Sequence, residues 1–349
     1  MALFSTRIVQ WQKQHGRHNL PWQGADAYRV WLSEIMLQQT QVVTVIPYYQ
    51  RFVESFPTTA ALAAATTDEV LAHWSGLGYY ARGRNLHKAA KIIVEQYRGT
   101  FPRRFEEILE LPGIGRSTAA AICALAYHER RSILDGNVKR VLARFLGISG
   151  VTSNKTVETL MWLQADALLP HDDVATYIQA QMDMGATICT RSKPKCDVCP
   201  VQSDCVAFQT NSVSELPTPK QRKAVPEKFT TFLLLTHDND ILLEKRGAQG
   251  IWGGMWCPPQ IDDGSGVADD YVQRNGIVVG ERIEMEEFTH TFTHFKLHIT
   301  PVLLKVNAKP VRVQQTGSEW LDVERALKSA IPAPVRKLLL QLQSLTKAC

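Results

Sequence analysis

The chain contains no hydrophobic run near the roughly 18 residues that a membrane-spanning helix needs. Residues 1–12 contain no apolar core of the length found in signal peptides. Internal repeats and low-complexity tracts are also missing, and nothing indicates an oxidising compartment in which disulfides would form. We therefore expect a cytoplasmic protein without a membrane partner, which excludes transporters and small disulfide-stapled secreted domains.

The chain also lacks a large excess of positive or negative charge. The 349 residues carry a net charge of +5, with 45% hydrophobic and 21% charged residues. This composition is that of an ordinary folded protein long enough for two domains. A mildly basic balance permits an anionic partner such as nucleic acid but does not require one.

The first part of the chain has helical patterning. Apolar residues recur at helical spacing, and glycine and proline separate the segments. Helices are predicted at 29–37, 67–74, 84–97, 117–126 and 137–146. Residues 214–228 hold three prolines, several basic residues and few large apolar ones, so they are interpreted as a linker.

The pattern changes after the linker. Residues 229–236 and 241–244 are typical of strands around a turn at 237–240, and 298–306 is predicted to be a third strand. Residues 334–345 are predicted to form a closing amphipathic helix. We thus expect a multi-domain chain, with an all-α domain at 1–213, a linker at 214–228 and an α+β domain at 229–349.

Four of the seven cysteines lie within seventeen residues, with the spacing C-x6-C-x2-C-x5-C. They are Cys189, Cys196, Cys199 and Cys205. Thiolates this close together can surround one metal centre, and all-thiolate ligation selects zinc or an iron–sulfur cluster. A single C-x2-C with longer arms favours [4Fe–4S], although the spacing alone leaves zinc open. Cys123, Cys257 and Cys349 are interpreted as ordinary reduced thiols.

The segment LPGIGRSTA at 111–119 predicts a glycine hairpin followed by a helix. Gly113 and Gly115 permit the tight turn, and exposed amide groups at the start of the helix suit a DNA phosphate. Taken alone, the segment could equally be a plain turn between helices. About twenty residues later, ILDGNVKR places Asp135 where another loop opens a helix.

These segments together resemble the helix-hairpin-helix DNA glycosylase superfamily, and within it the MutY-type adenine DNA glycosylases. The stretches LPW (20–22), WLSEIMLQQTQV (31–42), GLGYYARGRNLHKAA (76–90), CTRSKPKC (189–196) and FTHF (292–295) carry the same resemblance. It implies an all-α helix-hairpin-helix glycosylase domain with a [4Fe–4S] loop, followed by a Nudix-like domain. The implied activity is base excision repair, in which adenine opposite 8-oxoguanine or guanine is removed from double-stranded DNA.

Cleaving an N-glycosidic bond calls for an acid that protonates the base and a carboxylate that stabilises the sugar cation. Glu34 lies in an otherwise apolar helix, where desolvation would raise its pKa. The resemblance implies that Glu34 is this acid, that Asp135 stays ionised as the carboxylate, and that Asn137 positions the sugar and water. The alternatives are a surface role for Glu34 and a helix cap for Asp135.

Superfamily members that also cut the DNA backbone carry a lysine just after the G-x-G-R of the hairpin, where this chain has Ser117. A serine cannot form a Schiff base, so a monofunctional enzyme that leaves an abasic site is predicted. Lys139 is a weak substitute amine, and we expect it to hold a phosphate or the cluster region instead.

The enzyme must flip adenine out of the duplex and fill the gap. The resemblance implies that Leu37, Gln38 and Gln39 form the pocket and wedge and that Tyr79 intercalates beside the opposite base. It further implies that Trp22 and Gln179 contact the adenine. In the cluster loop, the residues implied to contact DNA phosphates are Arg191, Lys193 and Lys195. Trp31 and Trp74 are interpreted as core residues.

The second half resembles a Nudix-like domain through GIWGGMW at 250–256. A working Nudix hydrolase needs a glutamate-rich metal-binding helix, whereas this chain has only aspartate pairs at 262–263 and 269–270, so nucleotide hydrolysis is not expected. Phe292, Thr293 and His294 resemble the family's F-S-H loop, which reads the damaged guanine. No metal role is expected for His290 and His294.

Two other functions were weighed. An endonuclease III-like lyase is disfavoured by Ser117 and by the second domain. A catalytically silent lesion-binding protein is disfavoured by the presence of both Glu34 and Asp135. We expect a monomer that associates with the nucleoid through DNA, whereas the sequence names no repair-protein partner.

Overall fold

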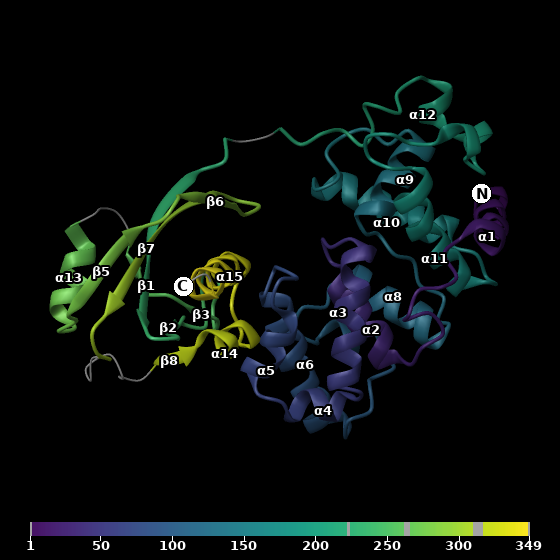
Figure 1. Cartoon of the computed structure of the whole chain (residues 1–349). Helices are drawn as coiled ribbons and strands as arrows, with labels where there is room; N and C mark the ends of the chain where they lie inside the picture. The colour runs from purple at the N-terminus through teal and green to yellow at the C-terminus, as the bar shows by residue number, and fades with distance from the viewer. Residues whose placement is uncertain (1, 222–223, 262–265, 310–316, 348–349) are drawn as a thin grey trace. The chain divides into compact units, whose positions relative to one another are not determined.

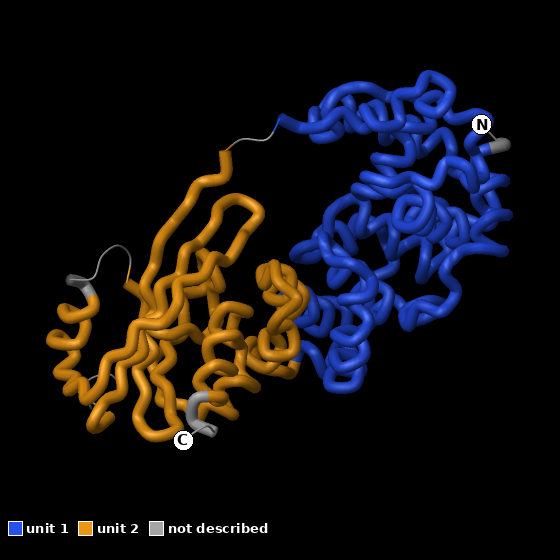
Figure 2. Tube along the Cα trace, turned by 45° about the horizontal axis from the view of Figure 1, so that its top comes forward, with its two compact units in different colours: residues 1–63, 88–222 blue, residues 64–87, 223–349 orange. Residues whose placement is uncertain are grey.

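The computed structural model describes residues 2–221, 224–261, 266–309 and 317–347. The chain divides into two compact units, which do not follow its two halves (Figure 2). Unit 1 comprises residues 1–63 and 88–222, and unit 2 comprises 64–87 and 223–349. A short helical segment from the first half of the chain, residues 64–87, therefore belongs to the unit that contains the sheet. Asp262, Asp263 and Cys349 lie outside the described residues.

Unit 1 is helical in its described residues (Figure 1). Its elements are α1 (Ala2–His15), α2 (Ala27–Leu37), α3 (Val42–Ser55), α4 (Thr59–Ala64), the later part of α6 (Ala81–Tyr97), α7 (Phe105–Leu109), α8 (Arg116–Tyr127), α9 (Gly136–Leu146), α10 (Lys155–Leu168), α11 (Val174–Asp183), a π-helical turn (Met184–Ile188), two 3-10 turns (Cys196–Val198 and Gln202–Asp204) and α12 (Val206–Gln209).

The core of unit 1 explains why these helices form. Apolar residues of α1, α8, α9, α10 and α11 pack into one cluster that includes Ile8, Leu142, Met161 and Tyr177. Capping residues set several helix starts. Asp26 accepts a hydrogen bond from the amide of Arg29 at the start of α2. The helices predicted at 29–37, 117–126 and 137–146 are confirmed as α2, α8 and α9.

Unit 2 contains α5 (Thr67–Trp74), the start of α6 and one mixed sheet. The sheet elements are β1 (Glu227–His237), β2 (Asp240–Lys245), β3 (Trp256–Cys257), β4 (Gln260–Ile261), β5 (Val279–Glu284), β6 (Phe288–Thr291), β7 (Lys296–Val306) and β8 (Ser318–Asp322). The helices are α13 (Gly266–Arg274), α14 (Val323–Lys328) and α15 (Ala333–Lys347). The predicted strands at 229–236, 241–244 and 298–306 and the closing helix are confirmed.

The sheet runs in the order β3-β2-β1-β7-β5, with β4 paired to β1, β6 to β7 and β8 to β2. β1 and β7 are parallel, whereas the other printed pairs are antiparallel. Side chains alternate between faces along β1, so Leu233 and Leu235 pack with residues of α13. Figure 1 shows α13 on one side of the sheet and α15 on the other. None of the helices in the described residues combines the length and apolarity needed to cross a bilayer.

The segment interpreted as a linker begins with anchored residues. Leu216 is buried, and its carbonyl accepts a hydrogen bond from Arg144 Nε at 2.8 Å. Thr218 accepts one from the amide of Gly150. The other end is a strand, because β1 already begins at Glu227.

Candidate active site

A cavity of about 780 Å³ lies within unit 1. Side chains from the end of α2, the first turns of α8, the start of α9, the π-helical turn and the cysteine loop line it. Eight of the predicted site residues are among them: Glu34, Leu37, Gln38, Gln39, Ser117, Asp135, Asn137 and Arg191. These eight residues lie up to 157 positions apart in the chain and are brought together around one cavity.

Glu34 projects from α2 among buried neighbours that include Ser33 and Ile35. Burial, and to a smaller extent the negative charge of Asp135, raise the pKa of Glu34 to about 8. A carboxyl group with this pKa keeps its proton at neutral pH. Glu34 can therefore donate a proton to a bound base.

Asp135 is the N-cap of α9, because its carboxylate accepts a hydrogen bond from the amide of Val138 at 2.7 Å. It is also part of the cavity lining, so the capping role and the site position coexist. Burial raises the pKa of Asp135 from its ordinary value, whereas the amides of Val138 and Asn137 and the charges of Arg140 and Lys139 lower it. Glu34 has no such opposing donors among the causes of its shift. The two carboxyl groups therefore sit in chemically different surroundings, which suits an acid and a carboxylate.

Asn137 is held against the π-helical turn. A Cβ added at Gly185 would lie 2.4 Å from Cβ of Asn137, so only glycine permits this approach. Arg140 Nη2 donates to Asn137 Oδ1 at 2.8 Å and to the carbonyl of Gly185 at 2.7 Å. The orientation of the Asn137 amide is thus fixed from two sides.

The two candidate lyase positions have different surroundings. Ser117 lines the cavity, and its hydroxyl accepts a hydrogen bond from the amide of Leu134 at 3.0 Å. Lys139 is not among the lining residues, and its ammonium pairs with Glu158 at 2.5 Å. The structure therefore gives Lys139 a partner on α10 rather than a place in the cavity.

The glycine hairpin directly precedes α8, whose first turns line this cavity. Gly113 has φ +83°, in the left-handed region where glycine is favoured, and Gly115 is the N-cap of α8. No side chain caps the first amides of α8. Gln38 Nε2 lies 3.4 Å from the carbonyl of Gly113. Gln39, the exposed residue that follows Gln38, has φ +57°. This left-handed backbone conformation is unusual for a residue other than glycine and marks a strained turn beside the cavity.

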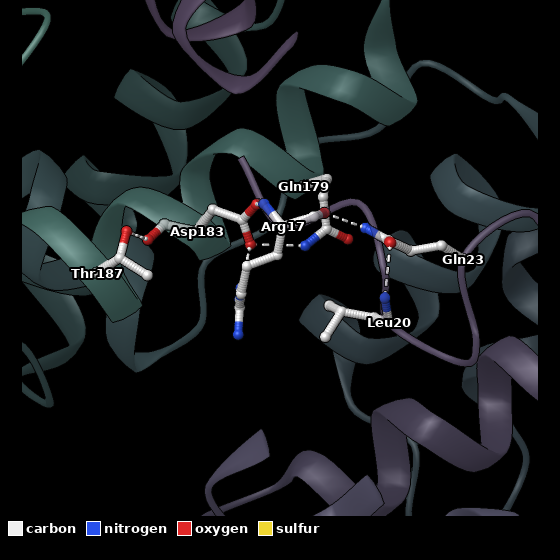
Figure 3. Close-up of polar contacts among 6 residues, drawn as sticks. All are labelled: Arg17, Leu20, Gln23, Gln179, Asp183 and Thr187. Carbon is white, nitrogen blue, oxygen red and sulfur yellow. Dashed lines mark hydrogen bonds and ion pairs between the residues drawn. The ribbon is translucent and has the colours of Figure 1, made fainter. Parts of the chain in front are cut away.

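One polar residue of this cavity, Arg17, is not indicated by the sequence. Arg17 lines the cavity, and its guanidinium and backbone amide bind the fully buried Asp183 at 2.6–2.9 Å (Figure 3). Gln179 Nε2 donates to the same carboxylate at 2.8 Å. The sequence gives no sign of this pairing, because 166 residues separate Arg17 from Asp183. Gln179 and Trp22 are buried and are not among the residues that line the cavity.

The four clustered cysteines line a separate small cavity in unit 1, between α9 and α12. None forms a disulfide in the described chain. Arg144 lies beside them, with Nη1 3.4 Å from Cys189 Sγ and 2.7 Å from the carbonyl of Thr190. Four reduced thiols converging on one space with a buried cation nearby fit a cluster of thiolate ligands. Arg191, in the same loop, also lines the catalytic cavity.

The predicted lesion-reading residues lie in unit 2. The loop Phe292–Phe295 joins β6 to β7. The hydroxyl groups of Tyr79 and Thr293 are 2.9 Å apart, and Tyr79 has φ +47°. Phe292 packs between Phe295 and Trp252, with ring centroids at 4.5 and 5.5 Å. A Tyr79 side chain from the first half of the chain therefore reaches the FTH loop within one compact unit.

His290 packs against aromatic rings. Its ring lies 5.8 Å from Trp252 and 4.7 Å from Phe292 by centroids. Burial lowers the pKa of His290 from its ordinary value. Its place is therefore that of a packing residue beneath the loop. The α13 helix, where a Nudix hydrolase would carry glutamates, has Asp269 and Asp270.

Family models match three segments. Residues 32–165 match the HhH-GPD superfamily of base excision DNA repair proteins, 189–205 the iron–sulfur binding domain of endonuclease III, and 230–341 the NUDIX domain. The second match assigns the cysteine loop to iron–sulfur binding, which the spacing alone left open against zinc.

Relatives match over nearly the whole chain. The adenine DNA glycosylase of Buchnera aphidicola from Acyrthosiphon pisum is 38% identical, covering 97% of each chain. The human adenine DNA glycosylase is 31% identical over 97% of this chain and 73% of its own length. Among solved structures, a thermostable thymine-DNA glycosylase has a TM-score of 0.54 at 26% identity, covering 60% of this chain and 96% of its own. An endonuclease III–DNA complex has a TM-score of 0.51 at 20% identity, covering 60% and 98%, which shows a shared fold.

Proposed function

The chain belongs to the adenine DNA glycosylase family, and from this we propose that it removes adenine paired with 8-oxoguanine or guanine and leaves an abasic site. It is a base excision repair enzyme that hydrolyses N-glycosidic bonds, and its cofactor is a [4Fe–4S] cluster. We also propose the choice of opposite base, the residue roles given below and a monomeric state. We further propose that the chain divides into a catalytic domain at 1–213, a linker at 214–228 and a lesion-reading domain at 229–349.

One observation carries the proposed chemistry: Glu34 and Asp135 line one cavity in unlike surroundings. Glu34, with a pKa of about 8, protonates the flipped adenine and makes it a better leaving group. Asp135 stabilises the positive charge that develops on the sugar. Amide donors and two cations around Asp135 favour its ionised form as this charge appears. Asn137, fixed by Arg140, positions the sugar and the attacking water.

The surroundings of Ser117 and Lys139 support a monofunctional reaction, in which the enzyme releases the base without cutting the DNA backbone. A lyase needs an amine that attacks the sugar carbon, and the hairpin position holds the hydroxyl of Ser117. Lys139 is engaged with Glu158 outside the cavity lining. The cysteines Cys189, Cys196, Cys199 and Cys205 would hold the cluster, which keeps Arg191 and its loop in place for DNA phosphates.

The test is a single-turnover assay on duplexes with adenine opposite 8-oxoguanine, guanine or thymine, each analysed with and without alkali. Strand cleavage only after alkali, fastest opposite 8-oxoguanine, supports the proposal. Cleavage without alkali would contradict the monofunctional part and direct attention to Lys139. Absence of base release from every duplex would refute the proposed substrate and favour a lesion-binding protein.

A further inference from the structure

A second cavity of unit 1, about 440 Å³ in volume, lies outside the catalytic cavity. We call it the arginine pocket, after the residues Arg116, Arg130 and Arg131 that line it. Arg116 begins α8, and the other two lie in the segment between α8 and α9. Asp166 contributes the one carboxylate among its described lining residues. The three guanidinium groups outnumber the two nearby carboxylates, Asp166 and the Glu129 that pairs with Arg131, so the hollow keeps a net positive charge that attracts an anionic group.

Two of the guanidinium groups lie over aromatic rings. Arg116 Cζ lies 3.8 Å from the ring centroid of Trp162, and Arg131 Cζ lies 4.2 Å from that of Phe105. These are cation–π contacts, and the planar fork of a guanidinium matches the geometry of phosphate oxygens. Because the contacts already restrict these side chains, less side-chain freedom is lost when an anion binds.

Neighbouring groups position the remaining charges. Arg130 donates to the carbonyls of Leu169 and Pro170 at 2.8 and 3.0 Å. Arg131 Nε donates to Glu129 at 3.2 Å. Asp166 accepts a hydrogen bond from Ser132.

The carboxylate of Asp166 does not occupy the edge of Arg116. The Asp166–Arg116 ion pair is 3.7 Å long, beyond hydrogen-bond distance. The Arg116 side chain is 52% exposed. Its N–H edge is therefore accessible to a ligand with stronger acceptor oxygens.

The place of the pocket indicates which anion it binds. Arg116 directly follows Gly115, the N-cap whose helix start carries the amides suited to a DNA phosphate. The hairpin and the arginine pocket therefore share the first turn of α8. A DNA strand with one phosphate on the hairpin would meet the stacked guanidinium of Arg116 next. We propose that the arginine pocket binds a further backbone phosphate of the substrate duplex, next to the one at the hairpin. This inference rests on the proposed function.

The experiment measures binding of the full-length, cluster-loaded protein to an undamaged 30-base-pair duplex over a series of salt concentrations. The test variant is Arg116→Gln/Arg131→Gln, which removes both guanidinium groups that lie over aromatic rings. The matched control is Arg51→Gln/Arg98→Gln, which removes the same charge from exposed positions outside both cavities. One lost phosphate contact should lower the slope of log K against log salt by about 0.9 and weaken binding roughly tenfold at low salt.

A second variant guards against misfolding. Arg131→Lys keeps the charge and loses the planar fork, so its salt slope should stay at the wild-type value while affinity falls less than for the glutamine variant. Slopes that are equal in the test and control variants would overturn the inference, and would leave an acidic protein segment as the occupant to examine. Base release by the wild-type protein is scored separately, so failure of the proposed function is distinguishable from failure of this inference.

Discussion

The hydroxyl oxygens of Tyr79 and Thr293 lie 2.9 Å apart, although 214 residues separate them in the chain. Tyr79 has a left-handed backbone, and Thr293 is exposed at the tip of the loop between β6 and β7. The residue proposed to intercalate and the residue proposed to read the opposite base therefore share a hydrogen bond in unit 2. Binding of a base to Thr293 would compete with this bond.

The first prediction concerns the hydroxyl of Thr293. Thr293→Val keeps the shape and removes the hydroxyl, so the preference for 8-oxoguanine over guanine should fall about threefold to tenfold, the value of one hydrogen bond. The measurement is the ratio of single-turnover rates on the two duplexes. Thr293→Ser and Tyr79→Phe serve as controls and should retain the preference, because each leaves a hydroxyl at position 293. An unchanged ratio in Thr293→Val would refute the assigned role.

The second prediction concerns pH. The pKa of Glu34 is raised to about 8 in the folded protein, so the active protonated form is present below that pH and is lost above it. Single-turnover base release at saturating enzyme should therefore fall as pH rises through about 8. Folding stability should decline as pH rises from about 4.5 to about 8, because in this window the unfolded chain loses the Glu34 proton while the folded protein retains it. A rate that stays constant to well above this pH would show that Glu34 is not the proton donor.

The third prediction uses the contact between Gly185 and Asn137. Gly185→Ala places a methyl group 2.4 Å from Asn137 Cβ, so Asn137 or the π-helical turn must shift. Because small displacements of positioning residues lower rates strongly, base release should slow by about tenfold or more. A melting curve establishes that the variant is folded. Wild-type rates in a folded variant would remove Asn137 from the proposed site.

The fourth prediction concerns the cluster. Cys199→Ser should reduce bound iron, measured by metal analysis, and weaken binding to undamaged duplex, because the loop that carries Arg191 loses its support. Cys123→Ser, at a buried thiol outside the loop, is the control and should retain full iron content. Full DNA affinity in an iron-free Cys199→Ser protein would show that the cluster does not organise the DNA contacts.

Some of this site could be predicted from sequence because the signals are local. Asp135 caps the start of a helix, Glu34 interrupts an apolar helix, and the four cysteines lie within seventeen residues of one another. Each signal depends on neighbours in the chain, and the structure brings these groups to the cavities.

Other features depend on long-range contacts that have no local signature. Arg17 meets Asp183 across 166 residues, and Asp183 by itself has the pattern of an ordinary helical acid. The placement of residues 64–87 with the sheet of unit 2 depends on contacts such as the hydrogen bond from Ser75 Oγ to the carbonyl of Ile331 at 2.6 Å. Neither contact is visible in periodicity or composition.

The most direct test of the account is the Glu34→Gln variant on a duplex with adenine opposite 8-oxoguanine, with base release and duplex binding measured on the same preparation. Glutamine keeps the shape and removes the transferable proton, so base release should fall at least about a hundredfold while the duplex is still bound. Base release near the wild-type rate would contradict the central claim, because adenine would then leave without the acid that Glu34 supplies.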